Sequence, residues 1–349
     1  MDRRTFLTAT LAVLAGCGHG EAFRAPDPWA RGPLVPGAIA RLTYSAGRDQ
    51  SPAWRADGSG ILYTFEDVTT GVRGWCLGVL PADGGSRTLS RCGLQRADSV
   101  YAYDWAAESP DGRIAALRAI SLRFAFGPYD WALVVAPGTD PAAGTRVVSI
   151  PFTSTTGLLV QGLSQVRWLD PATLIMVGER RFVGAPCRGC AVDTVATGRM
   201  LLTIPASGGT PAVVAGTDYA TSVAVRTSDE IFLTRGGDSR IYRRALAAGV
   251  TTAVWDFGPG QIARDVPVAG ERLVAVVGGQ VTWGLDPNVG DSTQVDGGGV
   301  LAVVELTSGT VQTLDPGFAV RRPALSADGR RAVVETGAGP ADLYLMQLP

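Results

Sequence analysis

The side chains that could do chemistry in this chain are carboxylates and guanidinium groups. The sequence has 32 acidic residues, and all of its 31 basic residues are arginine. The single histidine, His19, lies near the N-terminus. Lysine Schiff bases, histidine-based catalytic triads and multi-histidine metal centres are therefore excluded from the body of the chain. The formal net charge of −1 gives no global attraction to nucleic acid.

Six charged residues form the main candidate binding site. Each lies on the approach to a predicted inner strand, and together they are Asp49, Asp104, Arg167, Arg226, Asp265 and Arg322. If those strands surround a common axis, these side chains line one channel, and arginine supplies bidentate geometry for a carboxylate or a peptide end. The other interpretation is a solvated channel in which the charges partner each other.

Four cysteines could form two disulfides. Cys187-Arg-Gly-Cys190 lacks the second cysteine pair that a zinc site needs and the following histidine that haem attachment needs, so a local disulfide is the leading interpretation and a redox role the alternative. Cys76 and Cys92 lie eight residues on either side of Gly84. A hairpin closing at Gly84 would place these cysteines opposite each other, which predicts a cross-strand disulfide, with reduced buried thiols as the alternative.

A glycine-containing loop offers weak metal candidates. Asp286, Asn288 and Asp291 carry oxygen atoms of the kind that calcium binds. Their spacing fits no standard calcium loop, so an ordinary polar turn is the other interpretation. We therefore expect no cofactor, with calcium as the one exception considered.

A repeated turn indicates which elements position these residues. Residues 51 to 65 read as a strand, an Asp-Gly turn and a second strand. Periods of 41 to 59 residues are typical of propellers and solenoids, and 45 glycines and 22 prolines without helical periodicity favour an all-β fold. The six turns lie near Asp57, Asp111, Asp170, Ser228, Ala269 and Asp328.

Three copies of the repeat carry a family resemblance. The runs Pro52-Ala-Trp-Arg-Ala-Asp-Gly58, Ser109-Pro-Asp-Gly112 and Ser326-Ala-Asp-Gly329 resemble the repeat of TolB-like (WD-like) β-propellers. The resemblance covers residues 38 to 349 and implies a six-bladed β-propeller of four-stranded antiparallel blades. It also implies interaction with other envelope proteins, although no partner-binding motif of that family is identifiable.

The predicted ring needs its last blade completed. Residues 342 to 348 form a third strand of the sixth repeat with no fourth strand after it, and residues 39 to 45 precede the first repeat as an orphan strand. We predict that the two segments pair, which closes the ring and covers both edge strands. Trp54, Trp105 and Trp168 recur at one place in the repeat and are expected to pack between blades.

The first residues are typical of an export signal. A basic start and a short apolar run precede Leu14-Ala-Gly-Cys17, which resembles the bacterial lipobox. The pattern predicts a lipoprotein signal peptide at residues 1 to 16, lipidation of Cys17 and a tether at residues 17 to 37. An uncleaved apolar N-terminus is the alternative, and both the Sec and the twin-arginine route stay open. The expected location is the cell envelope, on the periplasmic face or the cell surface.

These expectations favour a non-catalytic protein. We predict a membrane-tethered propeller that binds an envelope protein or peptide as an accessory subunit and is not an enzyme, because the chain has no nucleophile–base set and no catalytic domain follows the propeller. One alternative is a hydrolase or lyase that acts on a glycan through carboxylates at the channel mouth. Another is a sensor of a small ligand or calcium.

Overall fold

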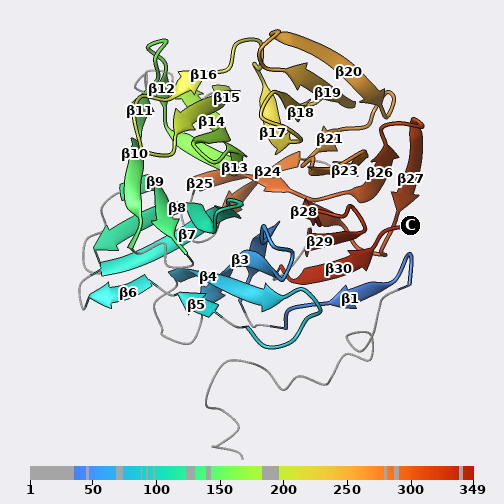
Figure 1. Ribbon diagram of the computed structural model, residues 1–349, viewed down its shortest axis with the longest axis horizontal. Helices are drawn as coiled ribbons and strands as arrows, with labels where there is room; N and C mark the ends of the chain where they lie inside the picture. Colours follow the sequence, from blue (N-terminus) through green and yellow to red (C-terminus); the bar gives the residue numbers. More distant parts are fainter. Residues whose placement is uncertain are drawn as a thin grey trace, which may run out of the picture.

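The computed structural model confirms the all-β class. It describes residues 35–44, 47–67, 74–87, 89–91, 93–96, 99–122, 130–138, 143–182, 196–278, 281–286, 291–337 and 341–349. Within these ranges the chain forms β-strands and turns and no α-helix. Six small antiparallel sheets surround a common axis, so the fold is a six-bladed β-propeller (Figure 1).

Each blade has four strands that lie side by side from the axis outwards, in chain order in blades 1 to 5 and with the N-terminal strand outermost in blade 6. Blade 1 consists of β2 (Asp49–Trp54), β3 (Gly60–Asp67), β4 (Gly74–Pro81) and β5 (Leu89–Arg91). Blade 2 consists of β7 (Ser99–Glu108), β8 (Arg113–Leu122), β9 (Asp130–Pro137) and β10 (Thr145–Ile150), with β6 (Gly93–Arg96) added beside β7. Blade 3 consists of β13 (Gly162–Asp170), β14 (Thr173–Phe182), β15 (Ala196–Pro205) and β16 (Ala212–Val213).

The second half of the ring follows the same plan. Blade 4 consists of β17 (Ala220–Val225), β18 (Glu230–Arg235), β19 (Arg240–Ala245) and β20 (Val250–Asp256). Blade 5 has an inner strand in two pieces, β21 (Ala263–Arg264) and β22 (Val268–Ala269), followed by β23 (Arg272–Val277), β26 (Val300–Glu305) and β27 (Thr310–Leu314). Blade 6 consists of β28 (Val320–Leu325), β29 (Arg331–Thr336), β30 (Leu343–Gln347) and β1 (Ile39–Arg41).

The ring closes as the sequence predicts. Strand β1 pairs with β30 in antiparallel register, with Ala40 opposite Leu345. Just beyond β1, the amide of Leu42 donates to the carbonyl oxygen of Leu343 at 2.8 Å, and Arg41 forms an ion pair with Asp342. The N-terminal strand thus covers the edge that β30 would otherwise expose.

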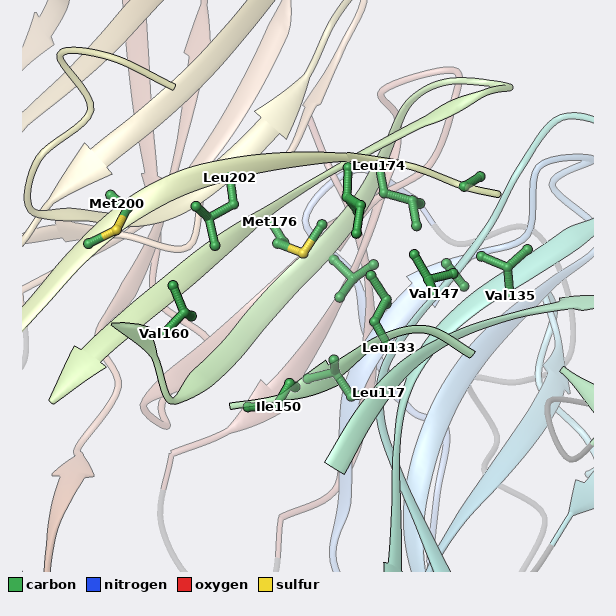
Figure 2. Close-up of a cluster of buried hydrophobic side chains, with 14 residues drawn as sticks. Leu117, Leu133, Val135, Val147, Ile150, Val160, Leu174, Met176, Met200 and Leu202 are labelled. Atoms are coloured by element: carbon green, nitrogen blue, oxygen red, sulfur yellow. The ribbon is translucent and has the colours of Figure 1, made fainter. Parts of the chain in front are cut away.

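Apolar residues hold neighbouring blades together. The buried hydrophobic side chains form six clusters, and each cluster lies between two adjacent blades. Successive residues of one strand point to opposite faces of its sheet, so on β14 Leu174 and Met176 pack against blade 2 while Ile175 and Val177 pack against blade 4. Figure 2 shows the cluster between blades 2 and 3. Both faces of a blade are therefore buried, which explains the continuous apolar runs in the sequence.

Two β-hairpins lie outside the blades. One is formed by β11 (Phe152–Thr153) and β12 (Leu159–Val160), and the other by β24 (Val281–Asp286) and β25 (Asp291–Asp296). The second hairpin connects β23 to β26 at the end of blade 5 where the inner strand begins, because Ala263 pairs with Val277. In the view down the ring it lies across the middle of the molecule (Figure 1).

The predicted signal peptide and Cys17 lie outside the described residues, so the predicted processing and lipidation stay predictions. Among the residues described, no helix is long and apolar enough to span a membrane.

Candidate functional site

A residue with a strained backbone recurs on or next to the inner strand of every blade. Six residues other than glycine have positive φ angles between 43° and 65°, one in each blade. In most blades the register of the inner strand shifts at this point, so the residue stands in a β-bulge. A left-handed backbone costs about 1–2 kcal/mol per residue outside glycine, and such strain often marks functional sites. The six residues are Ser51, Trp105, Gln165, Tyr219, Asp265 and Arg322.

Side chains from blades 1, 2 and 6 meet at this level. The hydroxyl of Ser51 donates to Oδ1 of Asp104 at 2.7 Å and accepts from Nη1 of Arg322 at 3.2 Å. The guanidinium of Arg322 also stacks over the ring of Trp105, 4.9 Å from its centroid. Behind them the fully buried Glu335 accepts from the backbone amide of Ser51 and from Arg322. The arginine is thus fixed by two other blades.

The network continues into blades 5 and 3. The backbone amide of Arg322 donates to Oδ2 of Asp265 at 3.2 Å, and Nε2 of Gln165 donates to Oδ1 of the same carboxylate at 2.7 Å. Blades 3 and 5 are not neighbours in the ring, so their side chains can meet only near the central axis. We call Ser51, Asp104, Gln165, Asp265 and Arg322 the axial cluster.

Arg167 adds a second positive charge beside the axial cluster. It lies on β13 two residues after Gln165. Burial lowers the pKa of its guanidinium to about 10, although the nearby charge of Asp265 opposes the shift. The side chain nevertheless keeps part of its surface accessible. Arg167 is therefore largely enclosed by protein and lies within electrostatic range of Asp265.

Four of the six predicted site residues come together at the axis, namely Asp104, Arg167, Asp265 and Arg322. Asp49 is fully buried at the start of β2. Arg226 follows β17 at the opposite end of the inner strand, where it forms ion pairs with Glu230 and Glu271. A binding role of these residues stays a prediction, but Arg226 is not part of the axial cluster.

Several members of this arrangement are not evident from the sequence. Gln165 and Glu335 are ordinary polar residues in strands, and no local pattern singles them out. Counting seven residues back from the turn glycines Gly58, Gly112 and Gly329 finds the bulge residues Ser51, Trp105 and Arg322. The repeat therefore contained a usable signal for the bulge.

The three repeated tryptophans do not share one position. Trp105 packs against the cluster between blades 2 and 3, as expected of a residue between blades. It occupies the bulge and contacts Arg322, however, whereas Trp54 and Trp168 lie three residues after the bulges of their blades. The expectation of a common place in the repeat was therefore wrong for Trp105.

Of the four cysteines that are predicted to form disulfides, the structure describes only Cys76. Cys76 is fully buried on β4 and is disulfide-bonded, but its partner is not among the described residues, so the pairing with Cys92 stays a prediction. Cys187 and Cys190 also lie outside the described residues.

The metal prediction is likewise open. Asp286 and Asp291 are paired in register at the end of the β24–β25 hairpin, and Asn288 lies outside the described residues. No group of three or more His, Cys, Asp or Glu residues is placed to hold a metal ion in the part of the chain that the structure describes. Calcium binding stays a prediction.

A cavity of about 490 Å³ lies away from the axial cluster, between blades 5 and 6, next to the C-terminal residues Leu348 and Pro349. Among its lining residues, Arg272 forms an ion pair with Glu305 and donates to the carbonyl oxygen of Gly329. The axial cluster is the stronger candidate for chemistry, because it joins residues from five blades near the axis.

The fold and this cluster define a six-bladed propeller with charged groups at its axis. No protein-family model matches the sequence, and no curated protein matches it. Solved structures of other propeller proteins do. A gluconolactonase from Xanthomonas campestris shares 14% identity and a TM-score of 0.52, over 89% of each chain. An oligogalacturonate lyase from Vibrio parahaemolyticus shares 12% identity and a TM-score of 0.50, over 89% of this chain and 93% of that chain.

A protein from Agrobacterium tumefaciens assigned as TolB shares 16% identity and a TM-score of 0.48, over 89% of this chain and 97% of that chain. The structure confirms the propeller that the TolB-like repeats predict. At these identities, likeness to solved structures establishes the fold alone.

The comparisons contradict the expectation that this protein is not an enzyme. That expectation rested partly on the lack of a catalytic domain beyond the propeller. The gluconolactonase and the lyase are matched over 89% and 93% of their own lengths, so each consists largely of a comparable propeller and still has an enzyme's name. A propeller without a further domain is therefore no evidence against catalysis.

Proposed function

We propose that this protein is a hydrolase or lyase that acts on a carbohydrate-derived substrate at the axial cluster. The observation that supports this most is the hydrogen-bonded chain that links Asp104 of blade 2 and Asp265 of blade 5 through Ser51 and Arg322. It brings carboxylates from opposite sides of the ring to the two sides of one arginine. Most enzymes that hydrolyse glycosidic bonds use a pair of carboxyl groups that flank the bond to be cleaved.

Each group has a role that its contacts support. Asp104 and Asp265 accept hydrogen bonds and keep part of their surface accessible, so either can take a proton from water or from substrate carbon. Arg322 is held in place by Ser51 and Glu335 and can stabilise negative charge that develops on a substrate oxygen. Hydrolysis and elimination both need such a base and such a cation, so the proposal covers both reactions.

The solved structures support the reaction class but do not establish it. One is named for a lactonase and the other for a lyase of oligogalacturonate. Under the same proposal, the predicted lipid anchor at Cys17 would hold the enzyme at the cell envelope. An envelope protein or peptide as a partner also stays a prediction.

The test is an assay of the purified protein on acidic oligosaccharides, neutral glycans and sugar lactones. Mass spectrometry of the products separates hydrolysis, which adds water, from elimination, which does not. We expect turnover of at least one substrate class. Asp104→Asn and Asp265→Asn should each lower kcat about 100-fold to 10,000-fold, the usual contribution of a general acid or base.

The matched control is Asp315→Asn, which changes an exposed aspartate after the outermost strand of blade 5. It should leave kcat unchanged, and thermal melting should show that all three variants fold. The proposal fails if no substrate is turned over, or if folded Asp104→Asn and Asp265→Asn variants are both as active as the wild type.

A further inference from the structure

The inner strand of blade 3 carries a large cation where other blades carry a small residue. Two positions after the bulge residue, blades 1, 2 and 6 have Ala53, Ala107 and Ala324. Blade 3 has Arg167 at the same position. Packing of the inner strand does not require an arginine at this position, because alanine occupies it in blades 1, 2 and 6. A local role of Arg167 near the axis is the remaining explanation.

The guanidinium of Arg167 has little compensation for its burial. Its Nη1 donates to the carbonyl oxygen of Val166 at 2.9 Å. Among the residues that the structure describes, no carboxylate lies within ion-pair distance of it, whereas Arg321 and Arg322 both pair with Glu335. Burying a cation without a paired anion is costly. With a pKa of about 10, Arg167 still carries its charge at neutral pH.

The surroundings favour a ligand with a single negative charge. Asp265 lies close enough to Arg167 to influence it, and Asp104 belongs to the same cluster. A doubly charged phosphate would be repelled by both carboxylates. A carboxylate carries one charge and fits the planar fork of a guanidinium with two parallel hydrogen bonds.

Polar and aromatic groups nearby suit a sugar. Gln165 and Ser51 provide hydrogen-bonding side chains from blades 3 and 1. Directly before the inner strand of blade 4, next to blade 3, Tyr219 has a positive φ and leaves 68% of its surface exposed. An exposed ring held in a strained backbone is available for stacking against the apolar face of a sugar ring.

We propose that Arg167 is the receptor for a carboxylate on the substrate, so that the substrate class is a carbohydrate built from sugar acids. The inference rests on the proposed function for its choice of a carbohydrate. It assigns Arg167 to substrate binding, separate from the acid–base role of Asp104 and Asp265.

The test measures binding by calorimetry on the full chain. The probes are an oligosaccharide of galacturonic acid, a neutral oligosaccharide of galactose of the same length, and a sugar phosphate. We expect the acidic oligosaccharide to bind about tenfold to a hundredfold more tightly than the neutral one, the range of a hydrogen-bonded charge pair. The sugar phosphate should bind more weakly than the acidic oligosaccharide.

Two variants and a control locate the effect. Arg167→Gln should lose most of the preference for the acidic probe and leave binding of the neutral probe within a factor of about two. Arg167→Lys should keep part of the preference, because the charge stays but the bidentate geometry is lost. Arg146→Gln changes an exposed arginine on the outermost strand of blade 2 and should bind like the wild type.

The inference is overturned if the wild type binds acidic and neutral probes equally, binds no acidic probe, or prefers the phosphate, or if folded Arg167→Gln keeps the preference. Binding and turnover are tested in separate experiments, so one proposal can fail without the other. If the protein prefers the acidic probe through Arg167 but turns over no substrate, this inference is supported and the proposed function is contradicted.

Discussion

The aspartates of the Asp-Gly turns are held by hydrogen bonds that their charged form accepts more strongly than their neutral form. In blade 2 the hydroxyl of Ser109 donates to Asp111, and Nε of Arg113 donates to the same carboxylate at 2.9 Å. These donors lower the pKa of Asp111 to about 2. In blades 1 and 6 the pKa values of Asp57 and Asp328 are lowered as well, chiefly by hydrogen bonds from Ser59 and Ser326. The repeated turn therefore favours carboxylates in the folded state.

This arrangement predicts an acid-sensitive stability. A carboxyl group whose pKa is lower in the folded state stabilises the fold above its unfolded pKa, and this stabilisation is lost as the pH falls towards the folded pKa. For Asp111 the window runs from about 3.8 down to about 2. We expect the melting temperature to fall between pH 4 and pH 2, and to fall less steeply in Asp111→Asn. Calorimetric melting of both proteins across this range checks the prediction, and identical pH profiles would contradict it.

At this scale the sequence identified charges but not their geometry. Asp104, Asp265 and Arg322 could be picked out because charged residues beside predicted inner strands are visible in a sequence. The positive φ of Trp105 and Arg322 could not be recognised from residue type, since bulky residues rarely adopt it, although both residues lie seven positions before a turn glycine. Arg226 was misplaced because β17 begins at Ala220, six residues earlier than the expected approach to the strand.

Pairs of blades share a contact made by tryptophan and arginine. The indole of Trp168 in blade 3 donates to the carbonyl oxygen of Ala107 in blade 2 at 3.0 Å, and Arg113 of blade 2 lies 4.9 Å from its ring centroid. Between blades 1 and 6 the same contact is made by Trp54, Ala324 and Arg331. Blade 2 has Glu108 at the tryptophan position, and Glu108 pairs with Arg55 of blade 1 instead. One position of the repeat thus links neighbouring blades by two different chemistries.

The contact predicts the cost of removing the indole N–H. Trp168→Phe keeps an aromatic ring but leaves the carbonyl oxygen of Ala107 without its donor, which should cost about 1 kcal/mol of unfolding free energy. The matched control is Trp255→Phe, because Trp255 packs against Phe257 and its indole makes no hydrogen bond among the described residues. Urea unfolding of both variants measures the difference. An equal loss in both would show that ring size, not the hydrogen bond, matters.

The sequence predicted these elements better than their contacts. The repeated Asp-Gly turns located the strands on either side of them within a few residues, because this dipeptide favours a hairpin turn. The link through Trp168 joins residues that are 61 positions apart. Such a contact depends on how two blades face each other, which a local pattern does not contain.

The whole molecule depends on six similar interfaces, and the ring makes them interdependent. Each cluster of buried side chains needs both of its blades, and the cluster between blades 6 and 1 contains Leu42 together with Leu343 and Leu345. The repeat count and the two orphan strands were enough to predict the ring. The axial cluster was only partly predictable, because its contacts join residues that are distant in the sequence, and the contact between Gln165 and Asp265 joins two blades that are not neighbours in the ring.

The pairing of β1 with β30 predicts how the ring opens when this contact is weakened. Leu42→Pro removes the amide that donates to Leu343 and replaces a side chain that is 3% exposed. Losing the buried leucine and leaving a buried carbonyl without a donor should cost about 3 to 5 kcal/mol. Because Arg41 and Asp342 are 301 residues apart in the sequence, opening this contact frees both ends of the ring. Hydrogen exchange should accelerate in blade 6 and blade 1 before blade 4.

Val35→Pro, at an exposed residue ahead of β1, should change neither stability nor exchange. If Leu42→Pro accelerates exchange only in residues 35 to 44, the N-terminal strand is an accessory to the ring and not its closure.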